Sequence, residues 1–185
     1  MIKIAITGGL RTGKDTVKER ILMTNDHFVC IAFGDALKRL YHDLLPWVPE
    51  HPKPRAGYQQ FGQTMREQFG EDIWIRHAER KLAFYDRHKR FDGVVLSDLR
   101  QPNEYEWARA NGFTIIRVTA PEETRLERAK HAGDKFDAAD LTHDTESHFE
   151  IFDVDYEIIN AGNFDDLYAQ IDAMMSELGN RSSAL

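Results

Sequence analysis

The stretch that most constrains the fold is "IKIAITGGLRTGKDT", residues 2–16. An apolar run enters a glycine-rich turn and leaves it at Lys14 into a helix-like segment. The spacing Gly8-x-x-x-x-Gly13-Lys14, between a strand and a helix, is typical of a loop whose backbone N–H groups surround phosphate oxygens. A tight glycine turn with a solvated lysine is the plainer alternative. Strand, spacing, lysine and helix all agree with the phosphate-binding interpretation.

The residue after Lys14 departs from the usual pattern. Most such loops have Ser or Thr there, whose hydroxyl binds magnesium, whereas this chain has Asp15 followed by Thr16. Asp15 lies at the expected N-terminus of a helix, where the dipole favours a negative charge. It can bind magnesium or the water around the ion while Thr16 contacts the nucleotide α-phosphate, or it can simply cap the helix.

Strand-like and helix-like segments alternate along the chain, which predicts βαβ units in an open α/β sheet. Several strands are apolar without a break, as in sheets that helices cover on both faces. The predicted strands are Ile2–Thr7, Phe28–Phe33, Gly93–Ser97, Phe113–Val118 and Tyr156–Ile159. The predicted helices are Lys14–Met23, Ala36–Leu45, Tyr58–Phe84 (as two helices), Asn103–Ala110, Glu122–Ala132 and Phe164–Leu178.

Two segments do not fit the alternation. Pro46–Arg55 holds four of the six prolines and is expected to be an irregular loop. Residues 132–148, "AGDKFDAADLTHDTESH", are polar without periodicity, and we expect a surface segment that acts as a lid. His143, Asp144, Glu146 and His148 lie within it, but no apolar residues surround them, so we do not expect a metal site there.

Composition narrows the function classes. The 185 residues, 42% hydrophobic and 30% charged, predict one globular domain, 1–185. A net charge of −7 argues against binding a nucleic acid polymer. Cys30 is the single cysteine and stands in an apolar run, so we expect a buried thiol and no intrachain disulfide. No apolar run approaches the roughly 18 residues that span a bilayer, so we expect a cytoplasmic protein without a membrane partner.

A second landmark is "VVLSDLRQPNE", where an apolar strand ends just before Asp98 and Arg100. In an open α/β sheet, ligands bind beyond the carboxyl ends of the strands, so both residues belong to the edge that carries the phosphate loop. An acid there can hold magnesium, and an arginine can clamp a phosphate with two hydrogen bonds. A helix-capping acid beside a surface arginine is the alternative.

With these segments in place, the chain resembles the P-loop kinases of the nucleoside monophosphate kinase superfamily, and more narrowly the phage-type deoxynucleoside monophosphate kinases. Their loop also reads Gly-Lys-Asp-Thr, a feature that phosphomevalonate kinases of the animal type share in its Gly-Lys-Asp part. The long insertion of the phage kinases before the Arg-x-x-x-Gln helix is missing. Further similar blocks are "FGDALKRL", "RAGYQQFGQTMRE", "DIWIR", "SDLRQPNEYEWARANGFTIIRV" and "DYEIINAGNFDDLYAQI".

The resemblance implies a three-layer P-loop kinase fold with a mostly parallel five-stranded sheet, flanked by helices. It implies a monophosphate-binding region at about 34–85 and a lid at about 122–148. It further implies transfer of the γ-phosphoryl group of ATP, with Mg²⁺ as cofactor, to the 5′-phosphate of a deoxynucleoside monophosphate. Relatives include dimers, which leaves a homodimer open.

The same resemblance assigns the donor side and the metal. For Asn160 and Gly162, which match a loop near the adenine in relatives, a plain turn after the strand is the alternative. The implied ATP-binding residues are Gly8, Gly9, Arg11, Thr12, Gly13, Lys14, Asp15, Thr16, Asn160 and Gly162, and the implied metal-binding residues are Asp15, Thr16 and Asp98.

The acceptor side and the lid follow in the same way. Lys38 can equally be a solvated helix lysine, and Arg125 and Arg128 stand near three glutamates that would pair with them on a solvated helix face. Trp74 is expected in the core, and Glu146 as a residue that orders the lid. The implied acceptor-binding residues are Lys38, Arg55, Gln59, Asp98 and Arg100, and the implied catalytic residues are Lys14, Arg100, Arg125 and Arg128.

Three functions stay open at this point. The first is a deoxynucleoside monophosphate kinase. The second is a related kinase of a phosphorylated metabolite such as phosphomevalonate or dephospho-coenzyme A. The third is a regulatory module that binds a nucleotide without transferring phosphate. The loop motif is common to all three, so the acceptor and the chemistry must decide between them.

Overall fold

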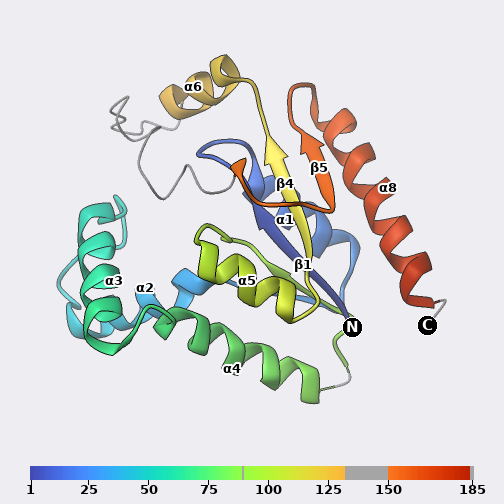
Figure 1. Ribbon diagram of the computed structural model, residues 1–185. Helices are drawn as coiled ribbons and strands as arrows, with labels where there is room; N and C mark the ends of the chain where they lie inside the picture. The colour runs from blue at the N-terminus through green and yellow to red at the C-terminus, as the bar shows by residue number, and fades with distance from the viewer. Residues whose placement is uncertain (89, 132–149, 184–185) are drawn as a thin grey trace.

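The computed structural model describes residues 1–88, 90–131 and 150–183. At its centre is a parallel sheet of five strands in the order β2-β3-β1-β4-β5 (Figure 1). Because every neighbouring pair is parallel, all carboxyl ends lie at one edge, where the phosphate loop leaves β1. The strands are β1 (Ile2–Thr7), β2 (Phe28–Ile31), β3 (Gly93–Leu96), β4 (Thr114–Thr119) and β5 (Tyr156–Ile159).

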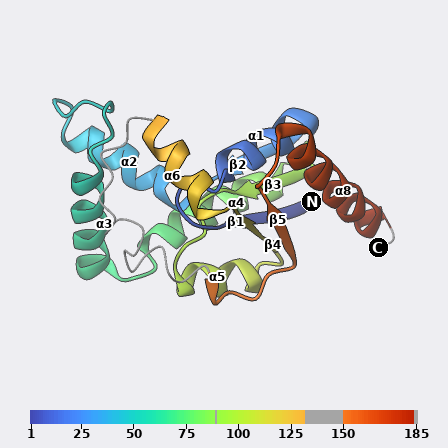
Figure 2. The ribbon, with the colours of Figure 1, turned by 90° about the horizontal axis from the view of Figure 1, so that it is seen from above.

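Helices cover both faces of the sheet, as expected for a three-layer α/β fold (Figure 2). On one face α1 and α8 pack against the strands, and on the other α2, α4 and α5 do so. The seven helices of the described part are α1 (Lys14–Thr24), α2 (Phe33–Leu44), α3 (Arg55–Phe69), α4 (Ile73–Arg87), α5 (Pro102–Ala110), α6 (Glu122–His131) and α8 (Phe164–Ser183).

The unbroken apolar strands follow from this double cover. Ile4 and Ile6 point into the core beneath α1 and α8, whereas Ala5 points into the core beneath α2, α4 and α5. All three side chains are fully buried. Since successive side chains of a strand alternate between the faces, a sheet covered on both sides needs apolar residues at every position. The predicted fold class is confirmed.

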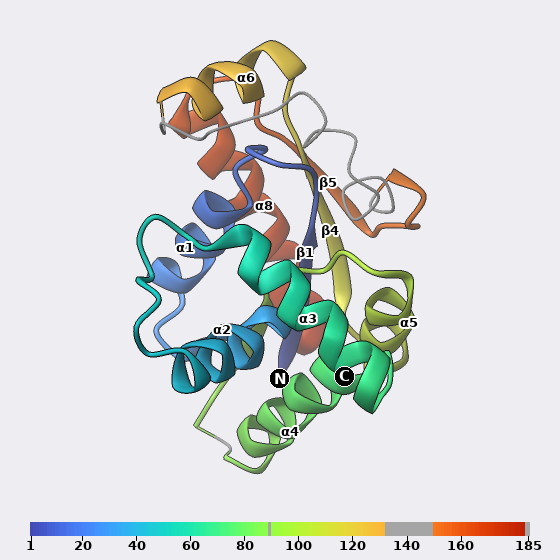
Figure 3. The same ribbon diagram turned by 90° about the vertical axis from the view of Figure 1, so that its left-hand side faces the viewer.

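The helix α3 stands apart from the sheet and packs against α2 and α4 (Figure 3). The segment between α2 and α3 has no regular secondary structure and contains the four clustered prolines, as predicted, although Arg55 is already the first residue of α3. Trp74 of α4 is only 2% exposed and belongs to the core, also as predicted.

The structure corrects three predictions at and after the second strand. β2 ends at Ile31, and α2 begins at Phe33 rather than at Ala36. The cause is a tertiary contact, since the Asp98 carboxylate accepts hydrogen bonds from the backbone N–H groups of Phe33 and Gly34 and caps the helix. Cys30, predicted to be buried, is only half-buried.

Part of the predicted lid can be compared with the structure. Its first ten residues form α6. Residues 132–148, with the histidine- and acid-rich stretch and Glu146, lie outside the described residues. Among the residues that are described, no helix is long and apolar enough to cross a membrane.

Candidate active site

The phosphate loop joins β1 to α1 in a backbone shape that requires glycine at both ends. Gly8 has φ of 141° and Gly13 has φ of 102°, values that L side chains disfavour. A Cβ atom at Gly8 would also collide with the carbonyl oxygen of Val118, and one at Gly13 with the side-chain amide of Asn160. No side chain caps α1 at Gly13. The N-terminus of a helix, with its amides and the positive end of its dipole, favours an anion at this place.

Lys14 folds back onto this loop. Its Nζ donates hydrogen bonds to the carbonyl oxygens of Gly8 and Gly9, both at 2.6 Å. Gly8 and Gly9 are buried, as is Thr12, whose hydroxyl donates to Gly9 O at 3.0 Å. These three predicted ATP-binding residues thus shape the loop from behind rather than line the cavity in front of it.

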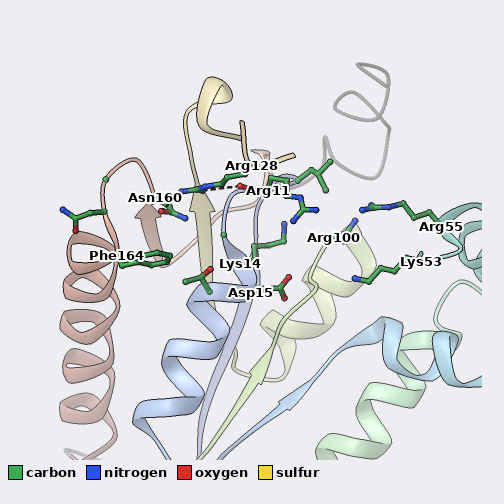
Figure 4. A pocket seen from close by; sticks show the side chains of 14 residues that line it. Arg11, Lys14, Asp15, Lys53, Arg55, Arg100, Arg128, Asn160 and Phe164 are labelled. Atoms are coloured by element: carbon green, nitrogen blue, oxygen red, sulfur yellow. Dashed lines mark hydrogen bonds between the residues drawn. The ribbon is translucent and has the colours of Figure 1, made fainter. Parts of the chain in front are cut away.

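A cavity of about 620 Å³ opens in front of the loop. In Figure 4 the charged ends of Arg11 and Lys14 from the phosphate loop, of Lys53 from the segment before α3, and of Arg55 from the first residue of α3 converge on the same space. Asp15 supplies the single carboxylate among the lining residues, so positive charge predominates in the cavity. This excess favours a polyanionic ligand. The lining residues are Leu10, Arg11, Gly13, Lys14, Asp15, Thr16, Lys53, Arg55, Arg100, Arg128, Asn160, Gly162, Asn163 and Phe164.

Asp15 is 87% exposed and forms an ion pair with Lys18, with 3.0 Å between Oδ1 and Nζ. Partial desolvation opposes its ionisation, but the hydrogen bond from Lys18 and the charges of Lys18, Lys14 and Lys53 hold the pKa of Asp15 below its usual value. In Figure 4 the carboxylate points toward Lys53 across the cavity. Asp15 is therefore an ionised group on the cavity wall and makes no side-chain cap of α1.

The loop is held from outside by two polar side chains. Asn160, 5% exposed at the end of β5, donates from Nδ2 to Thr12 O at 2.9 Å. Its Oδ1 accepts from Nη2 of Arg128 at 3.1 Å, and Nη1 of Arg128 lies 3.3 Å from Arg11 O and 3.4 Å from Thr12 O. Figure 4 shows this pair above the loop. Asn160 thus supports the loop from β5, a use of its amide that the sequence does not predict.

The two arginines of α6 that were predicted to be catalytic lie in different surroundings. Arg128 lines the cavity, whereas Arg125 does not. The Nε atom of Arg125 is buried, and no hydrogen-bond partner is found for it within the described part of the chain. The two side chains are therefore not equivalent, although their spacing places them on one side of the helix.

Sequence reasoning missed four residues that line the first cavity: Leu10, Lys53, Asn163 and Phe164. Phe164, the first residue of α8, is 65% exposed and lines the cavity just after the Asn160–Gly162 turn. An aromatic ring at that place can stack on a base. Lys53 precedes α3 by two residues. Phe164 belongs to the stretch "NAGNF", which also contains the predicted Asn160 and Gly162, so this motif could have indicated it. Lys53 stands in a proline-rich loop that matches no motif.

A second cavity, of about 590 Å³, adjoins the first at Arg100, which lines both. The predicted acceptor residues Lys38, Gln59, Asp98 and Arg100 all line it, whereas Arg55 lines the first cavity. The other lining residues are Phe33, Gly34, Leu37, Tyr58, Gln60, Gly62, Gln63, Arg66, Trp74, Gln101 and Glu104.

The two carboxyl groups that line this cavity, those of Asp98 and Glu104, accept hydrogen bonds from backbone N–H groups. Oδ1 and Oδ2 of Asp98 accept from the N–H groups at the start of α2, at 2.8 and 2.9 Å. Burial raises the pKa of Asp98 against the effect of these bonds. Glu104, 5% exposed, accepts at Oε2 from the N–H groups of Arg100 and Gln101, both at 3.0 Å. Burial, and to a smaller extent the negative charge of Asp98, raises the pKa of Glu104 to about 7. The two hydrogen bonds and the positive charge of Arg66 act in the opposite direction but are weaker.

Comparison with known families agrees with this geometry. A family model described as an AAA domain, AAA_18, matches residues 4–147, which is more than half of the chain. The chain belongs to this family. No curated protein matches it. The matched segment of this AAA domain protein includes the phosphate loop, α3, the Asp98–Arg100 segment and α6.

Solved structures share the fold over the full length. A dephospho-CoA kinase from Campylobacter jejuni superposes with a TM-score of 0.60 at 17% identity, covering 97% of this chain and 98% of that one. A shikimate kinase from Bacteroides thetaiotaomicron gives 0.55 at 12%, covering 96% and 98%. A gluconokinase from Sinorhizobium meliloti 1021 gives 0.54 at 14%, covering 98% and 95%. These likenesses establish the P-loop kinase fold and leave the acceptor unspecified.

The Asn160 support can be tested by Asn160→Ala. The change removes bonds to Thr12 O and to Arg128, so the loop should be less ordered before ligand binds. We expect the Kd for ATP to rise about tenfold, which corresponds to roughly one net hydrogen bond. Isothermal titration calorimetry measures this. Asn111→Ala, at the opposite edge of the sheet, is the control, and an equal Kd in both variants would contradict the role.

The raised pKa of Glu104 predicts a pH dependence of stability. Because the folded-state value of about 7 lies above the ordinary 4.5, the folded protein holds the proton more tightly than the unfolded chain does. The contribution of Glu104 to the free energy of unfolding is then fully present below pH 4.5 and lost as the pH rises through about 7. The free energy of unfolding of the wild type minus that of Glu104→Gln should fall by about 3 kcal/mol between acidic and alkaline conditions.

Urea denaturation of both proteins at a series of pH values measures this difference. Taking the difference removes the contributions of the other titrating groups, which the two proteins share. A difference that does not change with pH would show that Glu104 has an ordinary pKa.

Proposed function

We propose that the protein transfers the γ-phosphoryl group of ATP to the 5′-phosphate of a (deoxy)nucleoside monophosphate, yielding ADP and the nucleoside diphosphate. The observation that carries this proposal is Arg100, whose side chain lines both the phosphate-loop cavity and the neighbouring cavity. A guanidinium at such a junction can bind phosphate oxygens from both sides at once. The phosphorylated acceptor is thus the class that the junction fits.

The carboxylates of the second cavity support a phosphate acceptor over a hydroxyl acceptor. A hydroxyl group must lose a proton during transfer, so a nearby base is expected. Asp98, the carboxylate two residues before Arg100, already uses both of its oxygens to accept backbone N–H groups. An acceptor phosphate is already an anion and needs cations, which Lys38 and Arg100 supply.

The transfer needs positioning and charge compensation rather than a protein nucleophile. An oxygen of the acceptor phosphate forms a bond to the γ-phosphorus as the bond from that phosphorus to the β-phosphate oxygen breaks, and ADP leaves. Lys14, now bonded to loop carbonyls, is within the loop that would hold the β- and γ-phosphates. Arg11, Arg55 and Arg100 line the same space and can offset charge on the transferring group.

The cavity also offers oxygen ligands that suit Mg²⁺. The Thr16 hydroxyl and the ionised Asp15 carboxylate both belong to lining residues of the phosphate-loop cavity. A bound Mg²⁺ would neutralise charge on the donor phosphates. Asp98 is less suited, because both of its oxygens hold the start of α2.

An acceptor screen with ATP tests the proposed function. We expect turnover of deoxynucleoside monophosphates and none of gluconate or shikimate. Turnover confined to phosphomevalonate or dephospho-coenzyme A would favour the related metabolite kinases instead. Release of ADP, followed with a coupled assay, measures each reaction.

Lys14→Met tests whether the loop is catalytic. Losing the loop lysine should lower kcat/KM by at least about 100-fold, while Lys81→Met on the surface of α4 should leave it unchanged. If the wild type binds ATP but modifies no acceptor, and hydrolyses ATP no faster than Lys14→Met, the protein is a nucleotide-binding module.

Asp15→Ser tests the metal role of the unusual loop aspartate. Because Asp15 makes no contact that shapes the loop backbone, we expect ATP binding to be mostly retained. The concentration of Mg²⁺ that gives half-maximal activity should change, since an ionised ligand is replaced by a neutral one. An unchanged magnesium profile would assign Asp15 to its ion pair with Lys18 alone.

A further inference from the structure

A third cavity, of about 380 Å³, lies between the C-terminal half of α2, the proline-rich segment that follows it and the start of α3. It adjoins both cavities of the candidate active site. Lys53 lines it together with the phosphate-loop cavity, and Lys38 and Tyr58 line it together with the second cavity. The proposed transfer of a phosphoryl group leaves this third cavity without a role.

The wall of this cavity between α2 and α3 is held by aromatic contacts. Nε2 of His42 and the hydroxyl of Tyr58, both half-buried, form a hydrogen bond of 2.6 Å between the two helices. The rings of Tyr41 and Tyr58 pack edge to face, with 5.1 Å between their centroids. A Cβ atom at Gly57 would collide with the Tyr41 hydroxyl, so glycine lets α3 approach α2 here. The wall is therefore formed before any ligand binds.

Three cationic side chains line the third cavity, and none of them forms an ion pair. Lys38, Arg39 and Lys53 make no ion pair and no side-chain hydrogen bond with residues 1–88, 90–131 and 150–183. Lys81 on α4 differs, since its Nζ lies 2.9 Å from a carboxylate oxygen of Asp35. The hydrogen bonds that the three cations can donate are thus available to a ligand.

The carboxylates of Asp43 and Glu50 also line this cavity. Arg39 and Asp43 stand one helical turn apart on α2, a spacing that favours an ion pair, yet in the described part of the chain the two form none. The cations outnumber the carboxylates and come from two sides, α2 and the proline-rich segment. A diphosphate or triphosphate group carries enough anionic oxygens to reach both sides.

We infer that the third cavity is an inhibitory binding site for a diphosphate or triphosphate group, separate from the phosphate loop. Arg39 is specific to this site, since it lines neither of the other two cavities. Lys38 and Lys53 are shared, so a bound anion draws one lysine from the acceptor cavity and one from the phosphate-loop cavity. The inhibition rests on the proposed function, whereas the binding does not.

Isothermal titration calorimetry with inorganic pyrophosphate tests the binding. The protein is first saturated with a non-hydrolysable ATP analogue, which occupies the phosphate loop. We expect the Kd for pyrophosphate to rise about tenfold in Arg39→Met, as for the loss of one hydrogen bond between charged groups. Asp43→Asn should lower this Kd, because it removes a like charge from the cavity. Arg80→Met, on the exposed surface of α4, is the control and should match the wild type.

Initial rates at saturating ATP and constant free Mg²⁺ test the inhibition. Pyrophosphate should raise the KM for the acceptor, because Lys38 lines both sites. The inhibition constant should be about tenfold higher in Arg39→Met, whose kcat and KM without pyrophosphate should equal those of the wild type. Inhibition by excess ATP that Arg39→Met relieves would identify a nucleoside triphosphate as the ligand. Inhibition by pyrophosphate alone would identify the inorganic ion.

The outcomes separate this inference from the proposed function. No binding of pyrophosphate to the analogue-saturated wild type, or an equal Kd in a folded Arg39→Met, would overturn the site and leave the kinase assignment intact. Binding without a change in rate would overturn the inhibitory role. Binding that Arg39→Met weakens, in a protein that phosphorylates no acceptor, would support the anion site and overturn the proposed function. If Arg39→Met does not fold, Asp43→Asn decides, since an unchanged or higher Kd would contradict the site.

Discussion

Everything in the site depends on how residues 98–101 are held at the end of β3. From β1, the Thr7 hydroxyl donates to Leu99 O at 2.9 Å, and Leu99 N donates to Ile6 O. The Asp98 carboxylate holds the start of α2, and Glu104 holds the two amides that follow Leu99. Because four elements meet here, Arg100 has a defined place between the two cavities. Each buried carboxyl group accepts from two backbone N–H groups that burial would otherwise leave unpaired.

The charges that line the two cavities determine which ligands each cavity favours. Six cationic side chains from the phosphate loop, the α3 start, the β3 end and α6 line one cavity with a single carboxylate. Their mutual repulsion disfavours the empty site, and a polyanion relieves it. The neighbouring cavity differs, since its cations stand beside aromatic and amide side chains. The phosphate-loop cavity therefore suits a polyanion, and the neighbouring cavity offers its cations beside apolar and amide side chains.

Much of this arrangement is predictable from the sequence, and the exceptions share a cause. The phosphate loop, five parallel strands and the residues Lys38, Gln59 and Arg100 follow from local patterns and a family resemblance. The early start of α2 does not, because the carboxylate that caps it lies more than sixty residues away. The support of the loop by Asn160 has the same origin, since an amide on β5 meets a carbonyl near the N-terminus. Sequence patterns report on residues that are close along the chain, whereas these contacts join residues that are distant along the chain and close in space.

By itself, the sequence determined the order of strands and helices, the double cover of the sheet and the shape of the phosphate loop. Those features depend on local backbone preferences and on side chains that alternate between two buried faces. Only the tertiary structure decided which charges share a cavity: Arg55 lines the phosphate-loop cavity, and Arg100 lines both cavities. Charge interactions depend on distance and burial, and packing of helices sets both.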